Sequence, residues 1–182
     1  GAQFENSSFA TSLIPTSGST VTRNKDQANN SGDSSLINST EGVLYAEFSC
    51  LGLQNSSFLR LVSLNDGTSS EDNAVFIYQS NNTNNQIVFV LTASSSSVIG
   101  SAQSVSDITA FNKVAFLYKS GGSKIFINGS LVHTSTASFS LGTLNNLGLS
   151  KSTGSSGIEG KVKSVAVFKE ALTDAELIAL TS

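Results

Sequence analysis

The side chains best suited to chemistry in this sequence are one tyrosine and the amides beside it. Tyr78 precedes the run Gln79-Ser80-Asn81-Asn82-Thr83-Asn84-Asn85. Planar amides both donate and accept hydrogen bonds, and an aromatic ring offers an apolar platform, so the pattern is typical of a site for sugar hydroxyls. An ordinary polar hairpin loop is the competing interpretation. The residues predicted to bind a ligand are Tyr78, Arg60, Asn81, Asn82, Asn84 and Asn85.

Catalytic chemistry has little support in the sequence. The only histidine, His133, lies in a predicted hairpin strand, where a solvated or edge-packed imidazole is the simpler interpretation. Glu71 and Asp72 are adjacent, so on a strand their side chains would point to opposite faces. The chain has no Gly-x-Ser-x-Gly elbow, and Gly154-Ser155-Ser156-Gly157 lacks the lysine and helix of a phosphate-binding loop. We therefore predict no catalytic residues and no enzyme.

Three further candidate side chains are predicted to be buried. The chain has no Trp, and Tyr45 and Tyr118 lie in apolar runs that indicate core positions. Cys50 ends another apolar run and, as the only cysteine, cannot pair within the chain. One Cys and one His exclude a zinc site in practice.

Composition limits the partners. The chain has 182 residues and a formal charge of −3, and its ten Lys and Arg are scattered along the sequence, which argues against nucleic acid or a strongly anionic partner. No run approaches the roughly 20 apolar residues of a membrane span, so no membrane insertion is predicted. Charged residues make up only 13%, which predicts a surface of uncharged hydrogen-bonding groups.

The elements that must position these residues are mostly strands. Asn128-Gly129 between two apolar runs is a strong hairpin signal, and residues 85–92 are apolar on both faces, as in a central strand. About nine strands are predicted from alternation and β-branched or aromatic enrichment. They cover residues 43–50, 57–64, 74–79, 86–92, 97–103, 111–119, 123–127, 130–136 and 161–168.

The two ends of the sequence differ from this pattern. Thr173 and Glu176 form a capping box before a predicted helix over 173–180, and a helix this short must pack its apolar side chains on the sandwich. Residues 1–40 are predicted to be a lead-in strand (within 1–23) and a loop (24–40) that pack on the domain formed by 41–182. Because the sequence opens in the middle of a pattern, we expect a piece of a longer protein. The helix residues predicted to be buried are Leu177, Ile178 and Leu180.

Two segments carry a family resemblance. Residues 111–132 read as a hydrophobic strand, a short turn, a strand ending in Asn128-Gly129 and another strand, and residues 157–177 read as a last strand followed by Ala171-Leu172-Thr173-Asp174-Ala175-Glu176-Leu177. Together they resemble concanavalin A-like, laminin-G-like domains over residues 41–182. The resemblance implies an all-β fold, a two-sheet antiparallel jelly-roll sandwich with a short C-terminal helix, and a binding module.

The same resemblance suggests two kinds of site to look for, a glucanase active site and a calcium site. Retaining glucanases of this fold carry a Glu-x-Asp-x-Glu strand, with carboxyl groups about 5 Å apart, and this chain has no such strand. Laminin-G-like domains often hold calcium at a loop rim, which makes Asp66 and Asp72 the calcium candidates. Turn-forming Asp residues are the competing interpretation, and no other cofactor is predicted.

The lead-in suggests a setting. Gly1-Ala2-Gln3-Phe4-Glu5 and the run from Phe9 to Arg23 resemble a segment of bacteriophage tail-fibre and other virion-associated proteins. This implies a host-recognition appendage, virion or extracellular, that binds a glycan or host cell-surface polysaccharide and forms a homotrimer within a longer fibre. A structural or oligomerising spacer is the alternative, and a glycan-active hydrolase or lyase is a less favoured third.

Overall fold

A computed structural model provides the structure. The strand predicted within residues 1–23 falls almost entirely outside the residues that the structure describes, so that prediction is not tested. The structure describes residues 15, 17–19, 21, 31–51, 59–80, 82–151, 153, 157 and 160–182, without the side chains of residues 59 and 60.

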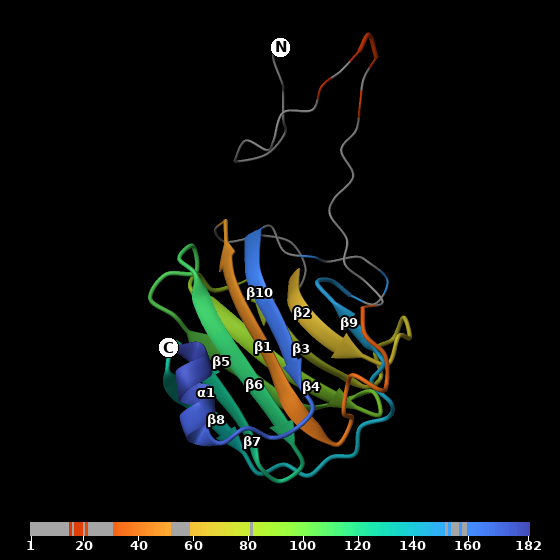
Figure 1. Ribbon diagram of the computed structural model, residues 1–182, viewed down its shortest axis with the longest axis vertical. Coiled ribbons are helices and arrows are strands. Elements are labelled where there is room, and N and C mark those ends of the chain that lie inside the picture. Colours follow the sequence, from red (N-terminus) through yellow and green to blue (C-terminus); the bar gives the residue numbers. More distant parts are fainter. Residues whose placement is uncertain are drawn as a thin grey trace.

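Two antiparallel five-stranded sheets face each other (Figure 1). We call the sheet that carries the C-terminal helix the helix sheet, and the other the open sheet. In spatial order, the helix sheet contains β10 (Gly160–Phe168), β1 (Glu41–Cys50), β6 (Asn112–Lys119), β7 (Ser123–Ile127) and β8 (Ser130–Ser135). The open sheet contains β5 (Ser96–Ser104), β4 (Gln86–Ala93), β3 (Ala74–Gln79), β2 (Leu59–Asn65) and β9 (Asn146–Gly148). This arrangement confirms the predicted sandwich.

The nine predicted strands are all present, with their ends within two residues of the predicted positions. Sequence analysis missed β9, because three residues are too few to show alternation. Within residues 24–40, predicted to be a loop, Ser31 forms an isolated antiparallel bridge with Leu147 of β9. No helix in the described part of the chain is long and apolar enough to cross a membrane.

The main core lies between the sheets, where inward side chains of both interdigitate. Phe89 of β4 meets Phe116 of β6 edge-on, with ring centroids 5.8 Å apart. Cys50 and Tyr118 are buried there as predicted, and burial raises the pKa of the Cys50 thiol to about 12. The hydroxyl of Tyr118 donates to the Asn38 carbonyl at 2.7 Å, so its polar atom is satisfied inside the sandwich.

A smaller core covers part of the outer face of the helix sheet. Helix α1 (Asp174–Thr181) has the predicted capping box at Thr173 and contacts β6, β7 and β8. Leu177 is fully buried in this core and Leu180 packs against it. The prediction for Ile178 is wrong, since it is 43% exposed. Helical periodicity turns Ile178 outward and places Thr181 inward instead, where its hydroxyl accepts from the Gly129 amide at 3.1 Å.

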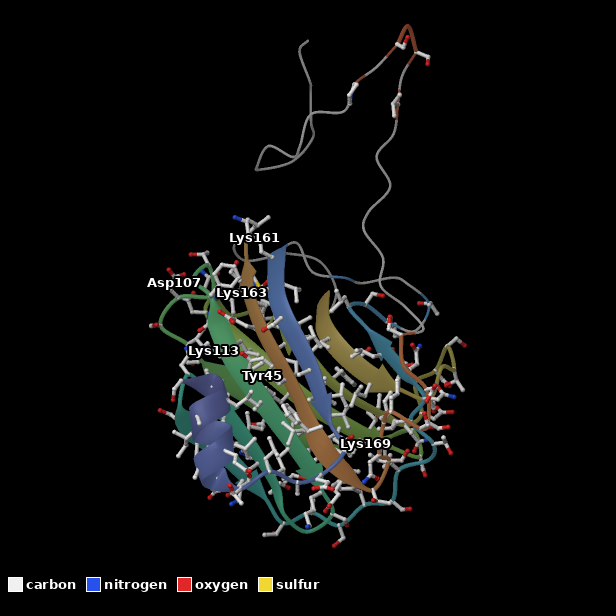
Figure 2. All side chains as sticks on the ribbon, in the orientation of Figure 1. Tyr45, Asp107, Lys113, Lys161, Lys163 and Lys169 are labelled. Atoms are coloured by element: carbon white, nitrogen blue, oxygen red, sulfur yellow. The ribbon has the colours of Figure 1, made fainter. Side chains whose placement is uncertain are left out.

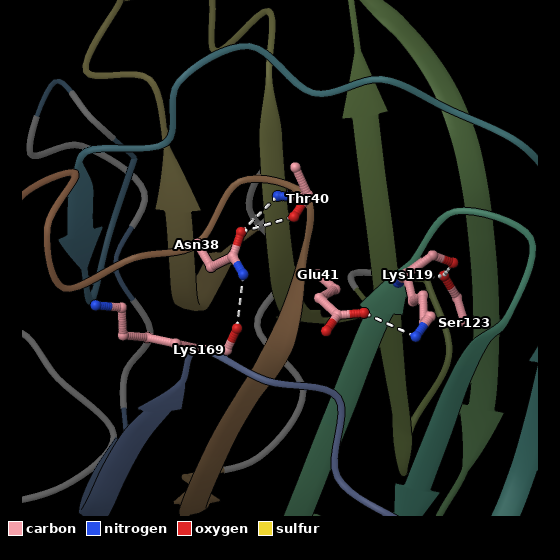
Figure 3. Close-up of polar contacts among 6 residues, drawn as sticks. All are labelled: Asn38, Thr40, Glu41, Lys119, Ser123 and Lys169. Carbon is pink, nitrogen blue, oxygen red and sulfur yellow. Dashed lines mark hydrogen bonds and ion pairs between the residues drawn. The ribbon is translucent and has the colours of Figure 1, made fainter.

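Polar contacts close the end of the helix sheet where β1 begins (Figure 3). The Asn38 amide nitrogen donates to the Lys169 carbonyl at 2.8 Å, and its oxygen accepts from the Thr40 amide at 2.9 Å. Lys119 and Glu41 form an ion pair of 2.8 Å across neighbouring strands. These contacts join the chain entering β1 to the chain leaving β10.

Two hairpin turns have left-handed backbones at both central positions. Asn128 and Gly129 have φ of 47° and 78°, which confirms the predicted turn between β7 and β8. Ser94 and Ser95, with φ of 48° and 66°, make the turn between β4 and β5 without a glycine. The Ser95 amide donates to the Asp72 carbonyl at 2.9 Å, which helps to hold this less favoured conformation.

Candidate functional site

The outer face of the open sheet carries an apolar strip, which we define as Phe76, Tyr78, Val88 and Val90. On β3 and β4 the alternate side chains, such as Ile77 and Phe89, enter the core, so the strip residues point outward. Tyr78 lies opposite Val88 and Phe76 opposite Val90 in the antiparallel register. Four adjacent apolar side chains therefore form one continuous surface.

The strip is partly exposed to solvent. Tyr78, Val88 and Val90 are partly exposed, and Phe76 is 8% exposed. The rings of Phe76 and Tyr78 lie 6.1 Å apart between centroids, tilted by 32°. On the next strand, exposed Gly100 and Ala102 lie opposite Val90 and Val88, so only small residues border the strip on the β5 side.

On its other side the strip meets a buried polar network. The Asn65 amide nitrogen donates to the Ser63 hydroxyl at 3.1 Å, and Asn146 donates to the Asn65 oxygen at 3.2 Å. The Ser63 hydroxyl donates to the Ser150 carbonyl at 3.0 Å, which brings the chain after β9 against β2. Within the described residues the Asn146 side-chain oxygen has no hydrogen-bond partner. The strip is thus apolar towards β5 and polar towards β9.

The loop that follows Tyr78 presents some of the predicted amides to solvent. Asn82 and Asn84 are exposed. Asn85 has a different role, because its side-chain oxygen accepts the Ile108 amide at 3.0 Å and its φ is 53°. Its amide therefore supports the neighbouring loop. Asn81 lies outside the described residues.

Arg60 lies next to Tyr78 in the sheet. Its Cα is the register partner of Tyr78 between β2 and β3, immediately before a bulge. The backbone thus brings Arg60 to the strip, and its side chain lies outside the described atoms.

The two calcium candidates sit at the opposite end of β3 from Tyr78. The Asp66 carboxylate accepts hydrogen bonds from the amide and hydroxyl of Thr68 and from the backbone and side-chain nitrogens of Asn73, at 2.7–3.3 Å. Burial alone would raise the pKa of Asp66, but these hydrogen bonds outweigh it and lower the pKa. Asp72 accepts from the Ser95 hydroxyl at 2.7 Å. Among the described residues, no three potential metal ligands gather.

The potentially catalytic residues are dispersed. His133 lies on edge strand β8 opposite Ile125, whereas Glu71 and Asp72 lie in the loop between β2 and β3 of the other sheet. A cavity of about 150 Å³ opens between β9 and β10, lined by Ser31, Leu147, Gly148, Leu149 and Val165. Its surface is apolar, so it lacks the convergent polar groups expected of a sugar or catalytic site.

Sequence analysis missed three outward-facing apolar residues. Val88 and Val90 belong to the segment predicted to be central because it is apolar on both faces, and β4 is indeed flanked by β3 and β5. A strand that is apolar on both faces can also have one face open to a ligand, so this pattern did not show that Val88 and Val90 face outward. Phe111, assigned to the start of a strand, is 48% exposed just before β6. Only the fold shows that its ring faces solvent.

Comparison with known proteins gives one family and a set of similar structures. The family model for the concanavalin A-like lectin/glucanases superfamily matches residues 52–178. A search of curated proteins finds no match. The CBM40 of the Ruminococcus gnavus IT-sialidase, solved bound to alpha2,3 sialyllactose, is 17% identical with a TM-score of 0.66, over 87% of this chain and 97% of that chain.

Two other similar structures come from different proteins. Domain 4 of an extracellular arabinanase from Geobacillus stearothermophilus, in complex with arabinotriose, is 13% identical with a TM-score of 0.61, over 83% of this chain and 70% of that chain. The botulinum neurotoxin serotype G binding domain is 12% identical with a TM-score of 0.60, over 85% and 37% of the two chains. At such identities the likeness shows a shared fold. With the family match spanning most of the sandwich, the chain belongs to the concanavalin A-like lectin/glucanases superfamily.

Proposed function

We propose that this chain is a non-catalytic carbohydrate-binding module that holds its glycan on the apolar strip and the adjacent loop. The observation that carries the proposal is the partly exposed Tyr78 beside Val88, followed in the chain by the exposed residues Asn82 and Asn84. A pyranose has an apolar C–H face and a rim of hydroxyls. The strip suits the face, and the amides suit the rim.

Each contact in such a site is weak. A neutral hydrogen bond to a sugar replaces one to water, for a net gain of about 0.5–1.5 kcal/mol. The described part of the chain offers no metal cluster to add affinity. We therefore expect weak binding per domain that does not respond to chelators.

The structural neighbours support a glycan as the ligand. Two of them were solved with saccharides, sialyllactose on the CBM40 and arabinotriose on the arabinanase domain. Their fold is shared with this chain, whereas the glycan that this chain binds is set by its own strip and loop.

Weak sites suit a multivalent assembly. The resemblance of residues 1–23 to tail-fibre segments supports a virion or other extracellular adhesive appendage, with a cell-surface polysaccharide as the target. Several linked copies, as in a homotrimer, raise avidity by roughly 10²–10⁴ through effective concentration.

An array of bacterial surface oligosaccharides, with whole-cell binding in parallel, tests the proposal on the full chain. Tyr78→Ala combined with Asn82→Ala and Asn84→Ala should abolish binding, and His133→Ala on the other sheet should leave it unchanged. Val88→Ser, which alters the strip without touching an aromatic ring, should weaken binding too. Binding that survives the triple change would place the site elsewhere, and a wild-type chain that binds no glycan or cell would favour the spacer function.

A further inference from the structure

The helix sheet carries an exposed aromatic and cationic surface that the strip does not explain. Phe111 is 48% exposed, and the Lys163 ammonium lies 5.6 Å from its ring centroid. Lys161, also exposed, lies two residues before Lys163 on edge strand β10. Figure 2 shows Lys161 and Lys163 at the same end of the sheet, with Lys169 at the other end. We name Phe111, Lys161 and Lys163 the cationic platform.

A buried carboxylate holds the central lysine in place. Glu47 is 8% exposed on the outer face of β1, and its Oε1 accepts from Lys163 Nζ at 2.7 Å. A β-bulge between Glu47 and Phe48 makes Lys163 the extra residue of β10, which turns its side chain towards Glu47. The ammonium has three N–H donors, of which the Glu47 carboxylate accepts one, and this ion pair favours a position beside the Phe111 ring.

The local charge favours an anion. Lys113 of β6 lies opposite Glu47 of β1 in the strand register, and its ammonium contacts the Ser182 carbonyl oxygen. Lysines of β6 and β10 therefore lie near Glu47, and Lys163 is the one that pairs with its carboxylate. The nearby Asp107 is turned into its own loop, where its carboxylate accepts from the Thr109 amide at 2.8 Å. Lys113, Lys161 and Lys163 outnumber the two nearby carboxylates, Glu47 and Asp107, by one charge, whereas the whole chain has a net charge of −3.

We propose that the cationic platform is a second binding site, for a carboxylated sugar such as a uronic acid residue of an acidic polysaccharide. The apolar face of the sugar packs on Phe111, while its carboxylate accepts hydrogen bonds from Lys163 and ion-pairs with Lys161. A neutral sugar lacks the second interaction and binds there poorly. The site lies on the opposite sheet from the strip and does not depend on it.

Protection of the sheet edge is the competing explanation for two of these residues. Lysines on an edge strand block pairing with another chain. That role accounts for Lys161 and Lys163, but it requires neither the exposed ring of Phe111 nor the buried Glu47 that anchors one ammonium. The two explanations predict different effects on ligand binding.

Calorimetric titration of the full chain with trigalacturonate, and with its neutral methyl ester, tests the platform. Trigalacturonate should bind with an affinity that falls as salt rises, and the ester should bind much more weakly. Lys163→Gln and Phe111→Ala should each lower the affinity about tenfold or more. Tyr78→Ala should leave trigalacturonate binding unchanged, which separates this site from the strip.

Lys169→Gln is the matched control, because it removes the same charge at the far end of the sheet, where the ammonium contacts the Ser35 carbonyl. Its affinity should equal that of the unaltered chain. The platform is overturned if wild-type chain does not bind trigalacturonate at millimolar concentration, if the ester binds equally well, or if Lys169→Gln matches the loss of Lys163→Gln. Aggregation of Lys163→Gln with unchanged affinity would assign the lysine to edge protection instead.

Discussion

At the scale of single residues, hydrogen bonding separates the amides that can meet a ligand from those that build loops. Asn82 and Asn84 are exposed, whereas Asn85 accepts the Ile108 amide. Ile108 in turn accepts the Cys50 amide at 2.9 Å through its carbonyl, so Asn85 links the open sheet to β1. The same residue type is thus exposed to solvent at two positions and supports a loop at a third.

This division predicts different effects on stability. Asn85→Gly should lower the free energy of unfolding by about 1–2 kcal/mol, because the buried Ile108 amide loses its acceptor while glycine keeps the positive φ without strain. Asn82→Ala should change it by less than about 0.5 kcal/mol. Urea unfolding of both variants measures the difference, and equal values would contradict the role given to Asn85.

Asp66 predicts a response to acid. Its pKa is lowered in the folded chain, so its contribution to stability is present above the unfolded pKa of about 3.9 and is lost as pH falls through the folded value. Asp66→Asn should therefore reduce the fall in unfolding free energy between about pH 5 and pH 2. Chemical unfolding at a series of pH values gives this slope. An unchanged slope would mean that the hydrogen bonds to Asp66 do not favour its charged form.

At the scale of elements, helix α1 and strand β9 show which elements local sequence patterns can predict and which they cannot. The capping box sets where α1 begins, and alternation sets the longer strands, because each depends on neighbours in sequence. Strand β9 pairs with Ser63, Leu64 and Asn65 of β2, and its own three residues are too few to predict this pairing from the sequence. The sequence also did not predict that Val88 and Val90 face outward, because periodicity shows alternation along a strand but not which face another element covers.

The helix provides a matched pair of substitutions. Leu177→Ala should lower the free energy of unfolding by about 2–4 kcal/mol, because this side chain is fully buried against the helix sheet. Ile178→Ala, one residue along and 43% exposed, should cost less than about 1 kcal/mol. Thermal or urea unfolding compares the two. Similar losses would show that α1 does not pack as described.

At the scale of the whole molecule, the fold was predictable and the sites were predictable only in part. Core and turn residues such as Tyr118 and Asn128 carry local signals, and the family resemblance depends on segments of this kind. Lys113 and Lys163, fifty residues apart in sequence, gather because β10 and β6 both pair with β1. Lysines that are scattered in the sequence are therefore neighbours in the fold, which composition could not reveal.

We propose a different class of sugar for each outer face. The strip on the open sheet suits neutral sugar rings, and the cationic platform on the helix sheet suits carboxylated ones. Helix α1 covers the β6 to β8 part of the helix sheet, which leaves the platform at one end of that sheet.

The central claim is that glycans bind on the strip, and an NMR titration of the labelled full chain tests it most directly. The ligand is the neutral oligosaccharide that binds most strongly on the array, and backbone amide shifts are followed residue by residue. We predict that saturable shifts cluster on Tyr78, Val88, Val90 and the loop at Asn82 and Asn84, with little change at Phe111 or His133. Shifts confined to other surfaces, or none at millimolar ligand, would contradict the account.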